Sequence, residues 1–171
     1  QVIFEDARVP VENRVGDEGE GFRFAMMGLD GGRLNIGACS LGGAQRCLDE
    51  AVKYTRERQQ FGQQIAEFQN TQFMLADMAT ELEASRALLY LAAAKVTDNA
   101  PDKSRFSAMA KRLATDNGSK IVNDALQLFG GYGYLKEYPI ERFWRDLRVH
   151  SILEGTNQVM RMIVGRDLLR Q

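Results

Sequence analysis

The chain has 171 residues, of which 44% are hydrophobic and 26% are charged, a composition typical of one globular domain with a sizeable core. Its formal net charge of −1 disfavours a nucleic-acid-binding protein, which normally carries a basic excess on one face. No apolar run approaches the roughly 20 residues that a membrane-spanning helix needs.

The first 20 residues predict a short strand and a loop. Val2, Phe4 and Val9 alternate with polar residues until Pro10 ends the pattern, and a loop follows through Asp-Glu-Gly-Glu-Gly at 17–21. The chain opens within this strand and without an initiator methionine. We therefore expect the sequence to be a piece of a larger protein.

Three long amphipathic helices are predicted next, because the period of the apolar residues changes from two to 3.6 after residue 22. The first ends at about residue 58, and its apolar stripe is formed by Leu34, Ala38, Leu41, Ala44, Leu48 and Val52. The second ends near 98–102, and its stripe is formed by Met74, Met78, Leu82, Ser85, Leu89, Ala92 and Val96. The third ends at the glycine pair 130–131, after a stripe of Phe106, Met109, Leu113, Ile121, Ala125 and Leu128.

Two shorter helices complete the predicted fold. One covers 138–149, with Pro139 in its first turn, and the last covers 156–169. Three long helices and a fourth assembled from the two short ones predict an all-α, antiparallel four-helix bundle, preceded by the short strand. The long helices carry apolar positions beyond one stripe, so we expect them to pack against another domain or a partner subunit.

The sequence lacks the residue sets of several common reactive sites. A di-iron centre in a helical bundle needs Glu-x-x-His pairs, but the single histidine, His150, follows Leu147 at that spacing. No Gly-x-Ser-x-Gly motif is present, and His150 has no obvious catalytic partner. Cys39 and Cys47 lie eight residues apart on one predicted helix, too far to form a disulfide, so we expect a reducing compartment.

Two local patterns have both a structural and a ligand-binding interpretation. Gly-Gly-Tyr-Gly-Tyr at 130–134 is typical of a helix C-cap, but it would also let a phosphate or an aromatic ring approach the backbone. Arg-Glu-Arg-Gln-Gln-Phe-Gly at 56–62 places basic residues in a last helical turn, where they favour the helix dipole. The same residues would suit a diphosphate beside a flat ring.

Glu154 lies between the apolar pair Ile152-Leu153 and Gly155, just before the last predicted helix. A single glutamate in such a loop is most often structural. The flanking apolar residues would, however, raise its pKa by desolvation, and Gly155 would let a ligand approach the backbone. A carboxylate in this setting is suited to act as a general base.

Four segments together resemble the C-terminal part of the acyl-CoA dehydrogenases, in the same order and at the same separations. They are VIFEDARVPVENRVGDEGEGF at 2–22, TRERQQFGQQIAEFQ at 55–69, ALQLFGGYGYLKEYPIERFWRDLRV at 125–149 and ILEGTNQVMR at 152–161. DGGRLNIGACSLGGAQ at 30–45 and GGYGYLKEY at 130–138 look most like the isobutyryl-CoA and short/branched-chain group. The resemblance covers essentially the whole chain.

The resemblance implies a flavoenzyme with an N-terminal helical domain, a middle β domain and a C-terminal four-helix bundle. Residues 1–20 would be the end of the β domain and a linker, and 21–171 the bundle, while the remaining parts would be absent from this chain. Members of the family assemble as homotetramers, dimers of dimers, through this bundle. The fragment alone is expected to be inactive.

The activity implied is the α,β-dehydrogenation of a short or branched-chain acyl-CoA, with FAD as the cofactor. The electrons would pass to an electron-transfer flavoprotein, in the bacterial cytoplasm or the mitochondrial matrix. The resemblance also implies that residues of the two other domains line part of the acyl-chain site.

The resemblance also implies roles for single residues. Glu154 matches the catalytic base, which some members carry instead at the position of Gly32, where a glycine cannot serve. Asp30, Arg33 and Gly155 match residues that contact the acyl-CoA. Among the residues matched to FAD contacts, those numbered between 58 and 131 would reach the FAD of a neighbouring subunit. The matched FAD contacts are Arg58, Gln60, Phe61, Phe68, Gln69, Gln127, Leu128, Phe129, Gly130, Gly131, Thr156, Asn157 and Gln158.

Two alternative functions stay open at this point. An acyl-CoA oxidase would share these residues and would differ in how readily its reduced flavin meets oxygen. From another class, the bundle could serve only for oligomerisation or cofactor contact, with no chemistry of its own.

Overall fold

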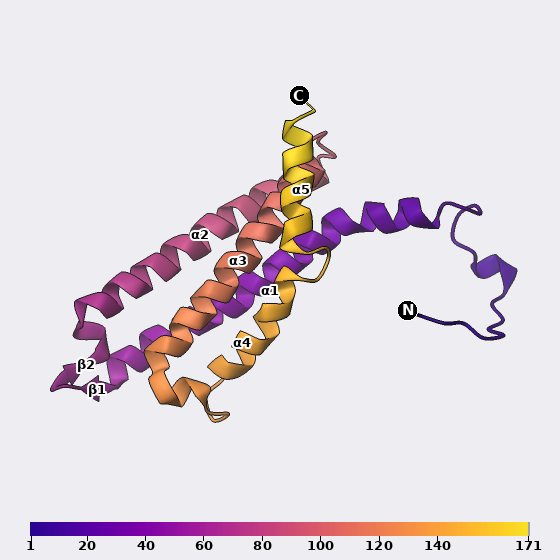
Figure 1. The fold of residues 1–171 in the computed structure, drawn as a ribbon. Coiled ribbons are helices and arrows are strands. Elements are labelled where there is room, and N and C mark those ends of the chain that lie inside the picture. The colour runs from indigo at the N-terminus through magenta and orange to yellow at the C-terminus, as the bar shows by residue number, and fades with distance from the viewer. Residues whose placement is uncertain (171) are drawn as a thin grey trace.

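The computed structural model describes residues 1–170 as an antiparallel helical bundle with one small hairpin (Figure 1). Its main elements are α1 (Gly21–Glu57), β1 (Gln59–Gln60), β2 (Gln63–Gln64), α2 (Gln69–Thr97), α3 (Lys103–Phe129), α4 (Ile140–Arg148) and α5 (Asn157–Leu168). Short 3₁₀ helices are η1 (Val11–Asn13), η2 (Ile65–Glu67), η3 (Gly130–Tyr134) and η4 (Val149–Ser151). The bundle is confirmed, with α4 and α5 following one another along its fourth side. No helix within 1–170 is both long and apolar enough to cross a membrane.

Helix α3 is the centre of the bundle, because it packs against α1, α2, α4 and α5. Its most buried face consists largely of small residues. At Gly118 the backbone of α1 comes so close that an added Cβ would lie 3.2 Å from the Ser40 Cβ. The predicted stripe on this helix was therefore partly wrong: Phe106, Met109 and Leu113 are only half-buried. A helix with neighbours on several sides can bury small residues where they let those neighbours approach.

The core itself is apolar and continuous across α1, α2, α3 and α4. Fully or almost fully buried members include Leu41, Leu48, Met78, Leu82, Ile121, Val122, Phe129 and Leu147. In α1 the predicted stripe is confirmed as buried at Leu41, Ala44 and Leu48, whereas Leu34 is half-buried and Ala38 and Val52 are exposed. In α2 it is confirmed at Met78, Leu82, Ser85 and Ala92, and its other three positions are half-buried.

Replacement of Ile121 by alanine is expected to lower the free energy of unfolding of the chain by about 2–5 kcal/mol, because it leaves a cavity in a well-packed core. Ile121 is fully buried. The matched control is Ile3→Ala, a chemically identical change at a side chain that is 68% exposed, with an expected effect within about 0.5 kcal/mol. Urea unfolding of the three proteins measures both values, and equal losses would contradict this description of the core.

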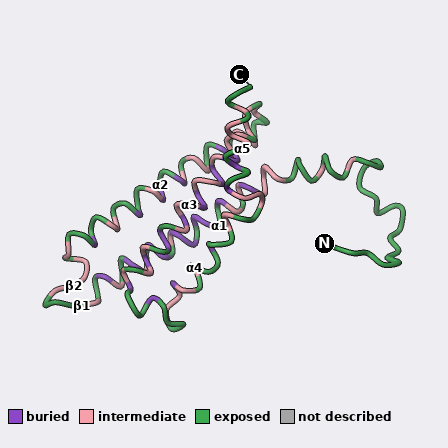
Figure 2. The backbone as a smooth tube through the Cα atoms, in the orientation of Figure 1, coloured by how far each residue is buried: buried purple, intermediate pink, exposed green. Residues whose placement is uncertain are grey.

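The strand predicted at the start of the chain does not form within the described residues. Residues 1–10 contain no strand, and residues 1–19 are exposed and extend away from the bundle (Figure 2). The reason is that a strand needs a hydrogen-bonded neighbour, and the bundle offers none. A hairpin forms instead at β1 and β2, where Gln59 pairs with Gln64. Its turn residues Phe61 and Gly62 both have positive φ, as a tight two-residue hairpin turn requires.

The two cysteines of α1 are not bonded to each other, as predicted. Cys39 is exposed and Cys47 is buried. Burial raises the pKa of the Cys47 thiol to about 12, so the thiol stays protonated at neutral pH. Cys47 therefore acts as a small apolar packing residue and not as a nucleophile.

Candidate functional site

Glu154 sits on a rigid turn between η4 and α5. Glu154 has a φ of 54° and Gly155 a φ of 89°, so two consecutive residues occupy the left-handed region. This conformation is uncommon for a non-glycine residue. Upstream, the Leu153 N–H donates to the Val149 carbonyl at 3.1 Å, and downstream the Thr156 hydroxyl accepts from the Val159 N–H as the N-cap of α5. The turn therefore fixes where the Glu154 side chain can point.

The Glu154 carboxylate lies directly against Gly32 of α1. A Cβ added at Gly32 would be 2.5 Å from Glu154 Oε2 and 2.8 Å from Cδ. The glycine thus provides the space that the carboxylate occupies. The two sequence positions considered for a catalytic base, 154 and 32, consequently face the same small region between α1 and the turn.

Ile152 and Leu153, which precede Glu154 in the sequence, do not shield its carboxylate from solvent as predicted. Ile152 is 52% exposed and Leu153 is 42% exposed, so both side chains largely face solvent in this chain. The predicted desolvation of the carboxylate by these two residues is therefore wrong for the chain as described. Sequence adjacency could not decide this, because the left-handed turn sends consecutive side chains in different directions.

Asp30 and Arg33, one turn apart on α1, form an ion pair beside this position. Arg33 Nη1 lies 2.9 Å from Asp30 Oδ1, and the Ser104 hydroxyl donates to Asp30 Oδ2 at 2.5 Å. Arg33 is only 7% exposed, and its Nε has no hydrogen-bond partner among residues 1–170. A buried N–H without a partner is costly unless a ligand or another part of the protein accepts it.

His150 does have a partner, which the sequence did not reveal. Its Nδ1 lies 2.7 Å from the hydroxyl of Ser40 on α1. Ser40 is fully buried, so no substrate can reach this pair as it would reach a hydrolase nucleophile. Burial lowers the pKa of His150, which favours the neutral ring. The contact ties η4 to α1 just upstream of Glu154. Within residues 1–170, no three acidic, histidine or cysteine side chains converge to hold a metal ion.

A second site lies at the C-terminal end of α3. A cavity of about 430 Å³ is formed there by α1, the hairpin and η3, and is lined by Tyr54, Arg58, Gln60, Ile65, residues 127–132 and Leu135. Seven of the residues matched to FAD contacts meet in this cavity from two segments far apart in sequence: Arg58, Gln60, Gln127, Leu128, Phe129, Gly130 and Gly131.

Part of the cavity wall is exposed glycine backbone, and an arginine side chain lies beside it. Gly130 has a φ of 59°, and an added Cβ at Gly130 or Gly131 would meet nothing within 4 Å. The Arg58 guanidinium lies over the Tyr132 ring, 5.3 Å from its centre. The ring of Phe129 is buried and stacks on the ring of Tyr54, with 4.1 Å between the ring centres. Exposed backbone, an arginine and a flat ring together suit a phosphate-bearing aromatic ligand.

The other matched residues lie outside this cavity. Phe61 is 91% exposed at the hairpin tip and meets Phe68 edge to face, 6.3 Å between ring centres, while Gln69 is exposed at the start of α2. Thr156, Asn157 and Gln158 follow Glu154 at the start of α5. Asn157 is buried and its amide bonds inside the protein, so only its backbone is available to a ligand.

The two sites are separated along α3. Lys111 contacts the Glu154 turn and Phe129 borders the cavity, and these residues are 18 positions apart, or about 27 Å at 1.5 Å per residue. Lys111, the largest fully buried side chain within residues 1–170, was not predicted as a site residue. The sequence did contain a sign of its burial, because Lys111 shares a helical face with the small residues Ser107, Ala114 and Gly118.

Comparison with known proteins shows the family to which the chain belongs. The family model described as "Acyl-CoA dehydrogenase, C-terminal domain" matches residues 19–169. The chain is 56% identical to the mitochondrial isobutyryl-CoA dehydrogenase of Dictyostelium discoideum, over 98% of this chain and 40% of that protein. It is 49% identical to the caffeyl-CoA reductase-Etf complex subunit CarC of Acetobacterium woodii, over 99% of this chain and 45% of that protein.

A solved structure agrees with the sequence relatives. The butyryl-CoA dehydrogenase of Megasphaera elsdenii superposes with a TM-score of 0.93 at 46% identity, over 98% of this chain and 43% of that one. The chain thus spans less than half the length of each of these three proteins. On the match of its residues 19–169, the chain belongs to the acyl-CoA dehydrogenase family.

Proposed function

We propose that this chain is the C-terminal part of a longer FAD-dependent enzyme that α,β-dehydrogenates a short or branched-chain acyl-CoA. Residues 21–171 would be its helical bundle and 1–20 the end of a preceding β domain with a linker. The observation that carries the proposal is the position of the Glu154 carboxylate, held on a left-handed turn against Gly32.

Glu154 would act as the general base that removes the α-proton of the thioester. The proton at this carbon becomes acidic only when the neighbouring carbonyl is polarised, and the backbone N–H of Glu154 would contribute to that as an oxyanion-type donor. Gly155 would let the acyl chain lie close to the backbone. The buried Arg33, whose Nε is free among the described residues, would receive a polar group of the CoA portion.

The residues present fit FAD at two places. The cavity with Arg58, Gly130 and Gly131 would take the adenine and diphosphate side of the cofactor of a neighbouring subunit, so the enzyme would be a homo-oligomer. Thr156, Gln158 and the backbone N–H groups at the start of α5 would touch the cofactor beside Glu154. FAD, when bound, would accept the β-hydrogen as hydride.

Filling the cavity without disturbing the fold is expected to release FAD from the full-length protein. Gly131→Leu adds a side chain where a Cβ meets nothing within 4 Å, so the bundle should fold while the side chain occupies the cavity. We expect the dissociation constant for FAD to rise by about tenfold, which corresponds to the loss of about 1.4 kcal/mol of binding free energy. The matched control, Gly42→Leu on an open face of α1, should keep the wild-type dissociation constant. Titration of the flavin-free proteins with FAD measures both values, and equal dissociation constants would contradict the cofactor assignment of this cavity.

The proposed substrate and electron acceptor follow the relatives. The Dictyostelium relative is named for isobutyryl-CoA, and the Acetobacterium relative is named as part of an Etf complex, so an electron-transfer flavoprotein is the proposed partner. Because the latter is named a reductase, a second candidate is the same site working in the opposite direction on an unsaturated thioester. The proposed compartment is the mitochondrial matrix or the bacterial cytoplasm.

The experiment uses the full-length protein, mixed without oxygen with isobutyryl-CoA and butyryl-CoA. Loss of flavin absorbance together with a product two mass units lighter would support dehydrogenation. In a second reaction, run with oxygen and without any other acceptor, oxygen uptake that matches turnover would identify an oxidase instead. A flavin-loaded protein that no acyl-CoA reduces and no enoyl-CoA reoxidises would leave only an assembly role for the bundle. The chain of residues 1–171 alone should show no turnover.

A further inference from the structure

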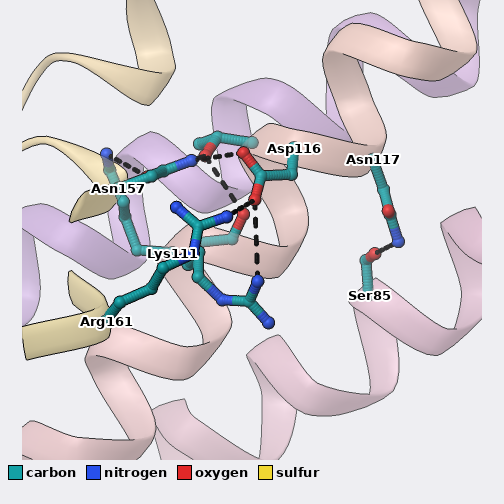
Figure 3. Close-up of polar contacts among 8 residues, drawn as sticks. Ser85, Lys111, Asp116, Asn117, Asn157 and Arg161 are labelled. Carbon is teal, nitrogen blue, oxygen red and sulfur yellow. Dashed lines mark hydrogen bonds and ion pairs between the residues drawn. The ribbon is translucent and has the colours of Figure 1, made fainter. Parts of the chain in front are cut away.

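Lys111 lies on α3 and reaches Asn157 at the start of α5 (Figure 3). Its side chain is fully buried, although lysine is rarely found so unless it is paired. Its Nζ donates to the Gly155 carbonyl at 2.9 Å and to Asn157 Oδ1 at 2.8 Å. Both acceptors belong to the turn or the first residue of α5, so one ammonium group holds the segment that follows Glu154.

Asn157 extends this contact into a network between α3 and α5. Its Nδ2 donates to the Thr115 hydroxyl at 2.9 Å and to Asp116 Oδ1 at 2.6 Å. Asp116 in turn pairs with Arg161, one turn further along α5, at 3.2 Å (Figure 3). The amide of Asn157 is therefore oriented from one side by Lys111 and from the other by Asp116. The start of α5 cannot shift without breaking several buried hydrogen bonds.

We propose that Lys111 is a positioning residue, which fixes the Glu154-Gly155 turn and so places the Glu154 carboxylate for proton removal. The inference rests on the proposed function, since it gives Lys111 a role through the proposed base. Lys111 donates to the carbonyl immediately after Glu154, and the Leu153 N–H is bonded immediately before it. Hydrogen bonds thus hold the backbone on both sides of Glu154, at the Leu153 N–H and at the Gly155 carbonyl. Together they keep the Glu154 carboxylate against Gly32.

The electrostatic surroundings agree with this role. Burial lowers the pKa of Lys111 to about 8, with Arg33 acting in the same direction and with Asp116 and Glu154 opposing the shift. The charged groups facing the ammonium are thus Asp116 on its own helix, Arg33 on α1 and Glu154 on the turn. At neutral pH the protonated form prevails, so Lys111 also places a positive charge near the carboxylate that it positions.

The test is a double-mutant cycle in the full-length protein with FAD bound. Lys111→Met removes the donors with little change in volume, and we expect the rate of flavin reduction by acyl-CoA to fall about tenfold or more, because small misplacements of a catalytic group are costly. In a Glu154→Gln background the same change should slow the reaction no further. Lys120→Met, at an exposed lysine of α3, is the matched control and should leave the rate unchanged. A purely structural lysine would instead give equal losses in both backgrounds and overturn the proposal.

A second readout does not depend on activity. Amide hydrogen exchange of a peptide covering 152–158 should become faster in Lys111→Met and stay unchanged in Glu154→Gln. Unchanged exchange in Lys111→Met would overturn the proposal even if the rate fell. If Lys111→Met fails to fold, Lys111→Gln is measured in its place, with the same two expectations, because its shorter side chain should not reach the Gly155 carbonyl and Asn157 Oδ1 together. If Glu154→Gln itself reacts as fast as wild type, the proposed base is wrong and the catalytic role of Lys111 fails with it. The exchange data then report separately whether Lys111 holds the turn.

Discussion

Replacement of Glu154 by glutamine is expected to slow flavin reduction by acyl-CoA at least about a hundredfold in the full-length protein. Glutamine keeps the size and hydrogen-bonding shape of the side chain but cannot accept the α-proton. Its position against Gly32 should be retained, so the binding of the thioester and of FAD should change little. Anaerobic stopped-flow mixing with isobutyryl-CoA measures the reduction rate directly.

A glutamate far from this site provides the control for the first prediction. Glu83 lies on α2 with its side chain 66% exposed and forms an ion pair with Arg86, one turn along the same helix. Glu83→Gln removes the same charge from the protein and should react like wild type. If Glu154→Gln also reacted like wild type, the base would lie elsewhere and the central assignment would be wrong.

The second large effect expected is the transfer of the base from position 154 to position 32. Glu154→Gly alone should lose at least about a hundredfold in rate, as any removal of the base would. Adding Gly32→Glu should restore at least about tenfold of that loss, since a carboxylate at 32 begins within 3 Å of the place that the lost one occupied. The three atoms nearest to a Cβ at 32 all belong to the Glu154 side chain, so replacing Glu154 by glycine removes the contacts that a Cβ at 32 would otherwise make.

The matched control for the relocated base is Gly42→Glu in the same Glu154→Gly background. Gly42 also lies on α1, and a Cβ there meets nothing within 4 Å, but it is more than two turns from Gly32. This variant should stay as slow as Glu154→Gly alone. If the double variants with glutamate at 32 and at 42 reacted at equal rates, whether both fast or both slow, the proposed position of residue 32 beside the reacting carbon would be contradicted.

The helices could be predicted from the sequence because their signals are local. Apolar spacing marked the three long α-helices, and Pro139 and the glycine pair 130–131 marked two boundaries within a residue or two of those observed. The initial strand could not be judged in this way, since a strand depends on a neighbour that the sequence does not specify. The buried face of α3 was also beyond local reasoning, because small residues become core residues only when other helices close around them.

The candidate site was predictable only in part. Glu154 stood out by its own surroundings in sequence, and the resemblance supplied the rest of the set. Local patterns gave no reason for Arg58 to meet Gly131, which the structure places on the same cavity. Lys111 was missed because a lysine on a helix is ordinarily solvated, and its burial follows from the packing of α5 over α3. The exposure of Ile152 and Leu153 likewise depends on the left-handed turn, which residue identities alone do not specify.

The most direct test of the central claim follows the α-proton itself. Full-length wild type and Glu154→Gln, both loaded with FAD, are incubated without oxygen in D₂O with isobutyryl-CoA, and deuterium at the α-carbon is measured by mass spectrometry. If Glu154 removes the α-proton reversibly, wild type incorporates solvent deuterium at that carbon while Glu154→Gln does not. Incorporation at the same rate in both proteins would show that another group takes the proton and would contradict the account.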